Sequence, residues 1–328
     1  MDLTPLSSIQ VRARTKDLRV IRAVSDLARI HRENSSIPIH ILGHGTNTVW
    51  GNQEINKSIL KIEISGLEIL KNSREFTWIQ VGAGESWDKV VQFAVENNLS
   101  GIEALSGIPG TAGAGPIQNI GAYGQEIEGS IETVTAFDWI TGDNISLGRD
   151  DCEFSYRDSV FKRRKNLIIT RITLKLSKKF PKTPDYPDTK KYFEGRTNPT
   201  LREIREAILE IRAKKLPDYK QIPNCGSFFK NPILSPREFK NLQAKYKDIP
   251  QFPAPDGVKI PAGWLIDQAG LKGAWIGKIQ ICPHNALILT NPLKNATPDD
   301  ILEARDKIVQ KIIREFGIKL ETEPEIVT

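Results

Sequence analysis

Residues 101–124 read GIEALSGIPGTAGAGPIQNIGAYG and contain seven glycines. Glycine loses more backbone freedom on folding than any other residue, so a loop this rich in glycine is costly to order. Close approach of the backbone to a bound ligand offsets that loss, because side chains at the same positions would block the ligand. The stretch therefore predicts a ligand-binding loop rather than a purely structural one.

Two shorter glycine loops precede it, GHGTN at residues 43–47 and GAGE at residues 82–85. Successive backbone N–H groups in such turns form concavities that bind phosphate. Taken alone, each loop is more typical of a structural turn. Neither fits the dinucleotide fingerprint of a Rossmann fold, because residues 48–50 (TVW) are not a helix start and the third glycine is missing.

Hydrophobic periodicity outlines the remaining elements, with alternating and β-branched runs for strands and a three-to-four residue spacing for helices. The expected strands are 10–14, 37–42, 60–64, 78–81, 133–139, 167–176, 275–281, 286–290 and a terminal strand. The expected helices are 25–33, with Ser25 as the N-cap, then 87–98, 201–214, 236–245 and 299–316. Helices and strands intermix without a regular βαβ alternation, so the predicted fold class is α+β.

The composition is that of a water-soluble globular protein of two or three domains, with 328 residues, 39% hydrophobic and 26% charged. No apolar run approaches the ~20 residues of a membrane span, and the first residues are too charged for a signal peptide. We therefore expect a cytoplasmic protein with no membrane insertion. A net charge of +6 fits anionic small molecules, and the basic run 162–165 lacks the interleaved aromatic residues of a nucleic-acid surface.

The three cysteines, Cys152, Cys225 and Cys282, are odd in number and widely spaced, and the chain has only four histidines. This pattern predicts isolated thiols, with neither a disulfide framework nor a metal site.

Further motifs follow the glycine loops in a fixed order. They are SGIPGT at 106–111, QNIGAYG at 118–124, SYRDS at 155–159, KLPD at 215–218, GSFFKNP at 226–232, AGWLI at 262–266 and PE at 324–325. With the GHGTN loop they resemble, over nearly the whole chain, the UDP-N-acetylenolpyruvoylglucosamine reductase (UDP-N-acetylmuramate dehydrogenase) family, in its longer-looped class with a loop tyrosine.

The resemblance implies an FAD-binding fold of the vanillyl-alcohol-oxidase type. Its two FAD-binding subdomains would span residues 1–66 and 67–212, and an α+β substrate-binding domain would span 213–328, with a terminal strand that can return to the first subdomain. FAD would be held noncovalently, and NADPH would be the reductant. The residues expected to bind FAD are Gly43, Gly45, Thr46, Asn47, Gly82, Pro109, Gly110, Thr111, Gly113, Asn119, Gly121, Ala122, Tyr123 and Gly124.

The implied reaction reduces UDP-N-acetylglucosamine enolpyruvate to UDP-N-acetylmuramate, a step of peptidoglycan precursor synthesis. Hydride addition at C3 leaves negative charge at C2 and on the adjacent carboxylate, which needs a fixed positive charge and a proton donor. The resemblance assigns the positive charge to Arg157, the proton donor to Ser227 and a third catalytic role to Glu325. Glu321 and Glu323 are rivals for that third role.

The resemblance also implies that substrate contacts come from Tyr156, Lys215, Lys230 and Asn231, and from Tyr186 on a mobile loop. Tyr192 is the competing loop tyrosine. We expect a monomer that binds its two small-molecule partners in turn. Two other functions remain open at this stage: an FAD oxidase that uses molecular oxygen, and a non-catalytic protein that binds UDP-sugars or nucleic acid.

Overall fold

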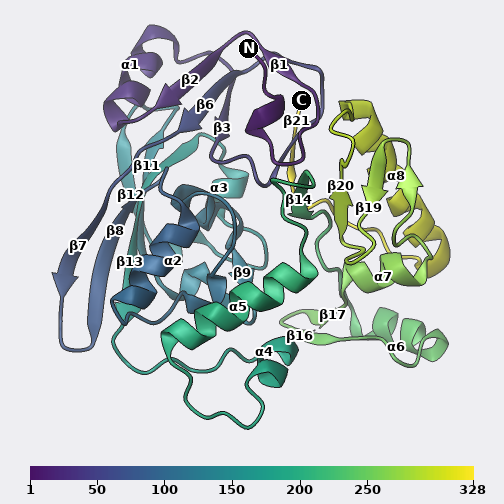
Figure 1. The fold of residues 1–328 in the computed structure, drawn as a ribbon. Coiled ribbons are helices and arrows are strands. Elements are labelled where there is room, and N and C mark those ends of the chain that lie inside the picture. Colours follow the sequence, from purple (N-terminus) through teal and green to yellow (C-terminus); the bar gives the residue numbers. More distant parts are fainter. The chain divides into compact units, whose positions relative to one another are not determined.

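The computed structural model describes residues 1–328 and divides the chain into two compact units (Figure 1). One unit combines Met1–Lys16, Gly45–Asn56 and Lys215–Thr328 and is called the C-terminal unit here. The other combines Asp17–His44 and Lys57–Lys214 and is called the glycine-loop unit. The predicted three-domain division, with boundaries near residues 66 and 212, remains a prediction.

The glycine-loop unit begins with a small parallel sheet in the order β2-β6-β3, accompanied by helix α1. Their bounds are β2 Leu18–Ile21, α1 Val24–Asn34, β3 Ile39–Leu42 and β6 Ser58–Ile62. The predicted N-cap, Ser25, is wrong. The helix begins at Val24, and the Asp26 carboxylate instead accepts hydrogen bonds from the N–H groups of Arg22 and Ala23.

A five-stranded antiparallel sheet in the order β12-β11-β13-β8-β7 forms the larger part of the same unit (Figure 1). The bounds are β7 Leu67–Asn72, β8 Phe76–Gly82, β11 Ile131–Asp138, β12 Asn144–Gly148 and β13 Leu167–Ser177. The central strand β13 is apolar and almost entirely buried, as its β-branched sequence predicts.

The remaining elements of the glycine-loop unit are short, apart from two helices. The helices are α2 Trp87–Glu96, α3 Val160–Arg163, α4 Pro187–Tyr192 and α5 Leu201–Lys215, and the last residue of α5 lies in the C-terminal unit. The strands are β9 Gly121–Ala122 and β10 Gln125–Glu126. The 3-10 turns are Glu103–Leu105, Ala112–Ala114, Pro116–Gln118, Ile127–Gly129 and Asp150–Cys152. The indole N–H of Trp87, a fully buried side chain, donates a hydrogen bond to the Leu105 carbonyl at 3.1 Å. Helix α2 is thereby fastened to the start of the glycine loop.

The C-terminal unit contains an antiparallel sheet β14-β20-β19-β18, a small sheet β15-β17-β16 and the parallel pairs β21-β4 and β1-β5. The strands are β1 Arg14–Thr15, β4 Thr48–Trp50, β5 Glu54–Ile55, β14 Asn224–Ser227, β15 Ile233–Leu234, β16 Phe252–Ala254, β17 Gly257–Lys259, β18 Trp275–Ile276, β19 Ile279–Ile281, β20 Ile288–Thr290 and β21 Glu325–Val327. The helices are α6 Pro236–Lys245, α7 Ala262–Gln268, α8 Pro298–Phe316 and the 3-10 turn Thr4–Leu6.

The expected strand 10–14 is replaced by a two-residue strand, Arg14–Thr15. Val11 and Ala13 are buried and alternate with exposed Arg12 and Arg14, which imitates the pattern of a strand. Gln10 has a φ of 53°, a left-handed conformation that interrupts an extended chain. The alternation therefore reflects burial of an irregular segment.

None of the helices is both long and apolar enough to cross a membrane. The three cysteines are buried and unpaired.

Asn291 joins three segments of the C-terminal unit. Its fully buried side-chain amide donates to the carbonyls of Ile9 and Gln10, both at 3.1 Å, and its Oδ1 accepts from the Ala296 N–H at 3.3 Å. Its own N–H donates to the Pro223 carbonyl. This side chain thus adds to the backbone hydrogen bonds that hold the N-terminal residues to the C-terminal part of the chain.

We expect Asn291→Ala to destabilise the protein by ~2 kcal/mol or more, because two buried carbonyls and one N–H lose their partner. Thermal unfolding at a fixed FAD concentration measures the effect. Asn52→Ala, at an exposed position, is the matched control and should leave the melting temperature unchanged. Equal melting temperatures for the two variants would contradict this role of Asn291.

Candidate active site

The first and third glycine loops meet in the glycine-loop unit. A Cβ added to Gly43 would lie 2.7 Å from the Thr111 Oγ1, so only glycine permits this approach. The neighbouring His44 side chain is hydrogen-bonded to the backbone of Gly110. Burial and the nearby Lys61 cation lower the pKa of His44, so its imidazole is neutral at neutral pH.

The second glycine loop meets the third at Ala83. The Gly113 N–H donates to the Ala83 carbonyl at 2.9 Å, and a Cβ added to Gly113 would lie 2.5 Å from the Ala83 Cβ. The Ala112 N–H donates to Glu85 and the Trp87 N–H to Gly110. The two short loops, each of which resembled a structural turn in sequence, therefore converge on the predicted ligand-binding loop, as a shared cofactor site requires.

The second and third glycine loops contain other predicted FAD-binding residues next to these contacts. Gly82 ends β8, where an added Cβ would lie 2.5 Å from the Ile64 carbonyl, and Pro109 precedes Gly110, which has a φ of 136°. The rest of the GHGTN loop belongs to the C-terminal unit. There Gly45 has a φ of 66°, and Thr46 and Asn47 lead into β4.

Asn119 is fully buried in the third loop and holds a left-handed φ of 44°. Its amide nitrogen donates to the Glu126 carboxylate at 3.1 Å and to the Ser155 carbonyl at 3.3 Å, and its oxygen accepts from the Glu128 N–H. All of these partners are protein groups. Asn119 therefore positions the loop and fastens it to the SYRDS segment.

Residues 121–126 form a tight β-hairpin, in which Ala122 pairs with Gln125 and Gly121 with Glu126. The two turn residues, Tyr123 and Gly124, both have positive φ, 52° and 81°. This is the pattern of a type I′ turn, whose first position rarely carries a bulky side chain. Burial raises the pKa of Tyr123 above its usual value, so its hydroxyl stays protonated at neutral pH.

Arg157 lies at the tip of a second turn, which Ser155 and Asp158 close by pairing with each other. Its φ of 55° is left-handed, and its Nη2 donates to the Gly121 carbonyl at 2.9 Å. The guanidinium also lies over the Tyr156 ring, 5.3 Å from the ring centre. The turn geometry thus places the predicted catalytic arginine and the predicted substrate-binding Tyr156 beside the hairpin of the glycine loop.

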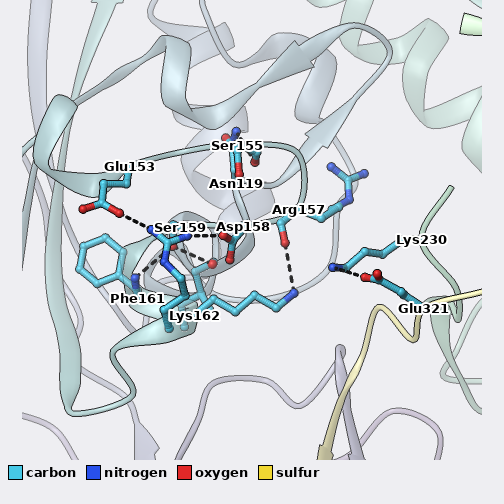
Figure 2. Close-up of polar contacts among 12 residues, drawn as sticks. Asn119, Glu153, Ser155, Arg157, Asp158, Ser159, Phe161, Lys162, Lys230 and Glu321 are labelled. Atoms are coloured by element: carbon cyan, nitrogen blue, oxygen red, sulfur yellow. Dashed lines mark hydrogen bonds and ion pairs between the residues drawn. The ribbon is translucent and has the colours of Figure 1, made fainter. Parts of the chain in front are cut away.

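Asp158 pairs with Arg163 rather than with Arg157 (Figure 2). Arg163 also binds Glu153, Lys162 donates to the Arg157 carbonyl, and Arg164 lies 3.6 Å from the Asp138 carboxylate. The basic run 162–165 is therefore largely matched by local acceptors, which fits its interpretation as a solvated turn.

Ser227 ends β14 in the C-terminal unit and pairs with Ile288 of β20. The preceding turn depends on buried Asn224, whose Oδ1 accepts from the Gly226 N–H at 2.9 Å while its nitrogen donates to the Pro217 and Ile222 carbonyls. Gly226 has a φ of 74°, which favours glycine. The partly exposed serine is thus presented by a rigid turn.

Lys230 and Asn231 follow in the same segment. The Lys230 ammonium pairs with Glu321 at 3.1 Å (Figure 2). The Asn231 Oδ1 accepts from the Ala262 N–H at the start of α7. Lys215 is exposed and is the first residue of the third segment of this unit.

The three candidate glutamates have different surroundings. The Glu321 carboxylate forms an ion pair with Lys230. The Glu323 N–H donates a hydrogen bond to the carbonyl of Phe228, the residue after Ser227. Glu325 begins β21, and its N–H donates to the carbonyl of Asn47 in the GHGTN loop at 2.9 Å. Within the C-terminal unit, Glu325 is therefore the one attached to a predicted FAD loop.

The two candidate loop tyrosines also differ. The Tyr186 ring packs edge-on against Tyr123 of the glycine-loop hairpin, with 5.4 Å between ring centres. The Tyr192 hydroxyl instead donates to Glu210 on α5, and its ring packs against Phe193. This placement favours Tyr186.

Comparison with known proteins agrees with these motifs. Residues 217–327 match the model of the UDP-N-acetylenolpyruvoylglucosamine reductase C-terminal domain, and residues 18–143 match an FAD binding domain. A UDP-N-acetylenolpyruvoylglucosamine reductase of Flavobacterium johnsoniae is 35% identical over 97% of this chain and 95% of its own. One of Bdellovibrio bacteriovorus is 37% identical over 98% of this chain and 97% of its own. The chain belongs to the UDP-N-acetylenolpyruvoylglucosamine reductase family.

The reductase fold is shared as well. The crystal structure of a UDP-N-acetylenolpyruvylglucosamine reductase from Thermus caldophilus has a TM-score of 0.71 at 23% identity, and the match covers 100% of this chain and 98% of that one. The predicted family, the α+β fold with an FAD-binding part, and the FAD cofactor are confirmed. The assignment of that fold to the vanillyl-alcohol-oxidase type stays a prediction. The individual site residues stay predictions.

No sequence motif pointed to Asp88, Arg205 or Arg212, which the structure places against the glycine loop. The Arg205 guanidinium donates two hydrogen bonds of 2.7 and 2.8 Å to the Asp88 carboxylate. Asp88 also accepts a hydrogen bond from the Gly107 N–H at 2.6 Å. The seven-residue spacing of Arg205 and Arg212 on a predicted helix was the one available signal, since it puts both on one face.

We expect Asn119→Asp to weaken retention of FAD and to destabilise the protein by ~2 kcal/mol or more, because it replaces a donor to Glu126 with a second carboxylate. The ratio of flavin to protein absorbance after gel filtration, together with the melting temperature, measures both effects. Asn72→Asp is the control, because Asn72 uses only its oxygen, as acceptor from Thr77. Similar results for both variants would refute the positioning role of Asn119.

Proposed function

We propose that this protein reduces UDP-N-acetylglucosamine enolpyruvate to UDP-N-acetylmuramate, with NADPH as reductant and FAD as cofactor, in peptidoglycan precursor synthesis. The observation that carries the proposal is the hydrogen bond from Arg157 to the Gly121 carbonyl, because it attaches the predicted catalytic segment to the predicted FAD loop. Family membership supports the same reaction. The cytoplasmic location and the monomeric state expected from the sequence are part of this proposal.

The residues present fit FAD. Gly43 and Gly113 make approaches that a Cβ would block, and the loops that contain them converge with residues 82–85. Backbone N–H groups of such loops can bind the cofactor's phosphates, while Asn119 holds the loop in shape. Bound FAD would supply the two-electron chemistry by which a hydride from NADPH reaches C3 of the enolpyruvyl group.

Arg157 would bind the substrate carboxylate. Its guanidinium is permanently charged and planar, so it can follow the negative charge that develops across C2 and the carboxylate. The Gly121 carbonyl and the Tyr156 ring already restrict its position, which reduces the cost of organising it during the reaction. Its neighbour Asp158 is paired with Arg163.

Ser227 would donate the proton to C2. The overall balance is then substrate, NADPH and one proton to product and NADP⁺. A serine hydroxyl is a weak acid, so the role requires groups that stabilise the alkoxide, and the turn N–H groups beside it and Lys230 are the candidates. We assign Glu325 to the third catalytic role on its attachment to Asn47, and Lys215, Lys230, Asn231, Tyr156 and Tyr186 to substrate contacts.

The proposal is tested by measuring NADPH oxidation with and without the enolpyruvyl UDP-sugar. We expect consumption of NADPH that depends on the sugar and proceeds without oxygen. Turnover that requires oxygen and ignores the UDP-sugar would identify an oxidase instead, and a colourless protein that fails to bind FAD would exclude both enzymes.

Ser227→Ala separates the two half-reactions. Bleaching of the flavin by NADPH should proceed at close to the wild-type rate, because that step delivers no proton to carbon. Re-oxidation by the UDP-sugar should slow by about 10²- to 10⁴-fold, the typical loss for a positioned general acid. Stopped-flow absorbance follows both steps. Equal slowing of both, or normal re-oxidation, would show that the Ser227 turn is structural.

A further inference from the structure

One face of helix α5 supports the glycine loop at two points. Arg205 and Arg212 lie seven residues apart, about two helical turns, so they project from the same face. Arg205 holds Asp88, and Asp88 holds the Gly107 N–H near the beginning of the loop. Arg212 reaches the same glycine, because a Cβ added to Gly107 would lie 3.2 Å from the Arg212 Nε.

Arg212 also reaches the far end of the loop. Its guanidinium interacts with the Tyr123 hydroxyl, and burial lowers the pKa of Arg212 without making it neutral at physiological pH. Asp88, the nearby acid, is already bound through both oxygens by Arg205. The Tyr123 hydroxyl is therefore a polar partner of this partly buried arginine.

Tyr123 needs this support, because it occupies the first position of a type I′ turn with a φ of 52°. A bulky residue persists in such a conformation only where its surroundings determine it. The surroundings here are the Arg212 guanidinium, the Tyr186 ring and a small apolar cluster. The members of that cluster are Phe193, Ile204, Ala207 and Ile208.

The Tyr123 ring is in turn a support for Tyr186. The two rings meet edge to face at 5.4 Å, an arrangement that aromatic pairs favour. Tyr186 is the N-cap residue of α4, and its carbonyl accepts from the Thr189 hydroxyl at 2.8 Å and the Lys190 N–H at 2.9 Å. A displaced Tyr123 ring would therefore change the position of the whole first turn of α4.

We propose that Arg212 is a positioning residue that fixes Tyr123 through its hydroxyl and thereby sets the position of Tyr186 for binding the nucleotide substrate. The order of action is Arg212 to Tyr123 to Tyr186, all within the glycine-loop unit. The substrate part of this inference rests on the proposed function. The loop-ordering part does not.

A double-mutant cycle in KM for the UDP-sugar tests the substrate part. Arg212→Met in the wild-type background should raise KM about tenfold, a factor within the range for a hydrogen bond to a charged group. In the Tyr186→Ala background the same substitution should change KM by less than about twofold, because the residue it positions is gone. Tyr123→Phe, which removes only the hydroxyl, should reproduce the effect of Arg212→Met and serves if that variant fails to fold.

Arg202→Met removes a charge from an exposed position of the same helix and should leave KM and kcat unchanged. An Arg212→Met effect of equal size in both backgrounds, or loss of FAD with unchanged KM, would overturn the proposal. Because the cycle compares variants of an active enzyme, a failure of the proposed function would be visible first, as wild-type protein without turnover.

Hydrogen exchange tests the loop part on purified protein without substrate. In Arg212→Met and Tyr123→Phe, the amides of Lys190 and Phe193 in and next to α4 should exchange about tenfold faster, since the first turn of α4 loses its support. Their exchange in Arg202→Met should match the wild type. Unchanged exchange of these amides in both test variants would overturn the proposed order of action.

Discussion

The close approach of Gly113 to the Ala83 backbone is the constraint on which the rest of the glycine-loop unit depends. The 2.9 Å hydrogen bond between them leaves no room for a side chain at residue 113, and it fastens the third loop to the turn between β8 and α2. The Gly43 contact with Thr111 adds the first loop to the same junction. Three loops that are far apart in sequence thereby lie next to one another. A cofactor as long as FAD needs contacts from several such segments.

Two side chains connect the third glycine loop to the SYRDS segment, which contains the predicted catalytic arginine. Asn119 satisfies its hydrogen-bonding groups with three protein partners, one of them the carbonyl of Ser155. Arg157, two residues further along, returns a hydrogen bond to Gly121. Because the two bonds run in opposite directions between the same two segments, neither segment can shift without breaking one of them. Asn119, whose contact with FAD stays a prediction, therefore also fixes the position of its loop.

Local signals were enough where an element's bounds are set by its own residues. Helix α6, Pro236–Lys245, lies where a helix was predicted, and the structure shows a capping box of Ser235 and Glu238 at its start. Helix α1 was misjudged by one residue, since Asp26 rather than Ser25 caps it. The segment 10–14 was misjudged entirely, because alternating burial in a tertiary interface looks the same in sequence as alternation in a sheet.

By itself, the sequence determined the family, the FAD-binding α+β fold and the glycines at the loop contacts. Turn residues and glycines act on the backbone of their own short segment, so their effect can be predicted from neighbouring residues alone. Tertiary structure alone decided which partner each polar side chain takes. It paired Asp158 with Arg163, paired Asp88 with Arg205, and brought Tyr123 next to Tyr186 and Arg212, which lie 63 and 89 positions further along the chain. The physical reason is that a hydrogen bond depends on distance in space, whereas sequence spacing fixes distance only within a few residues of the same element.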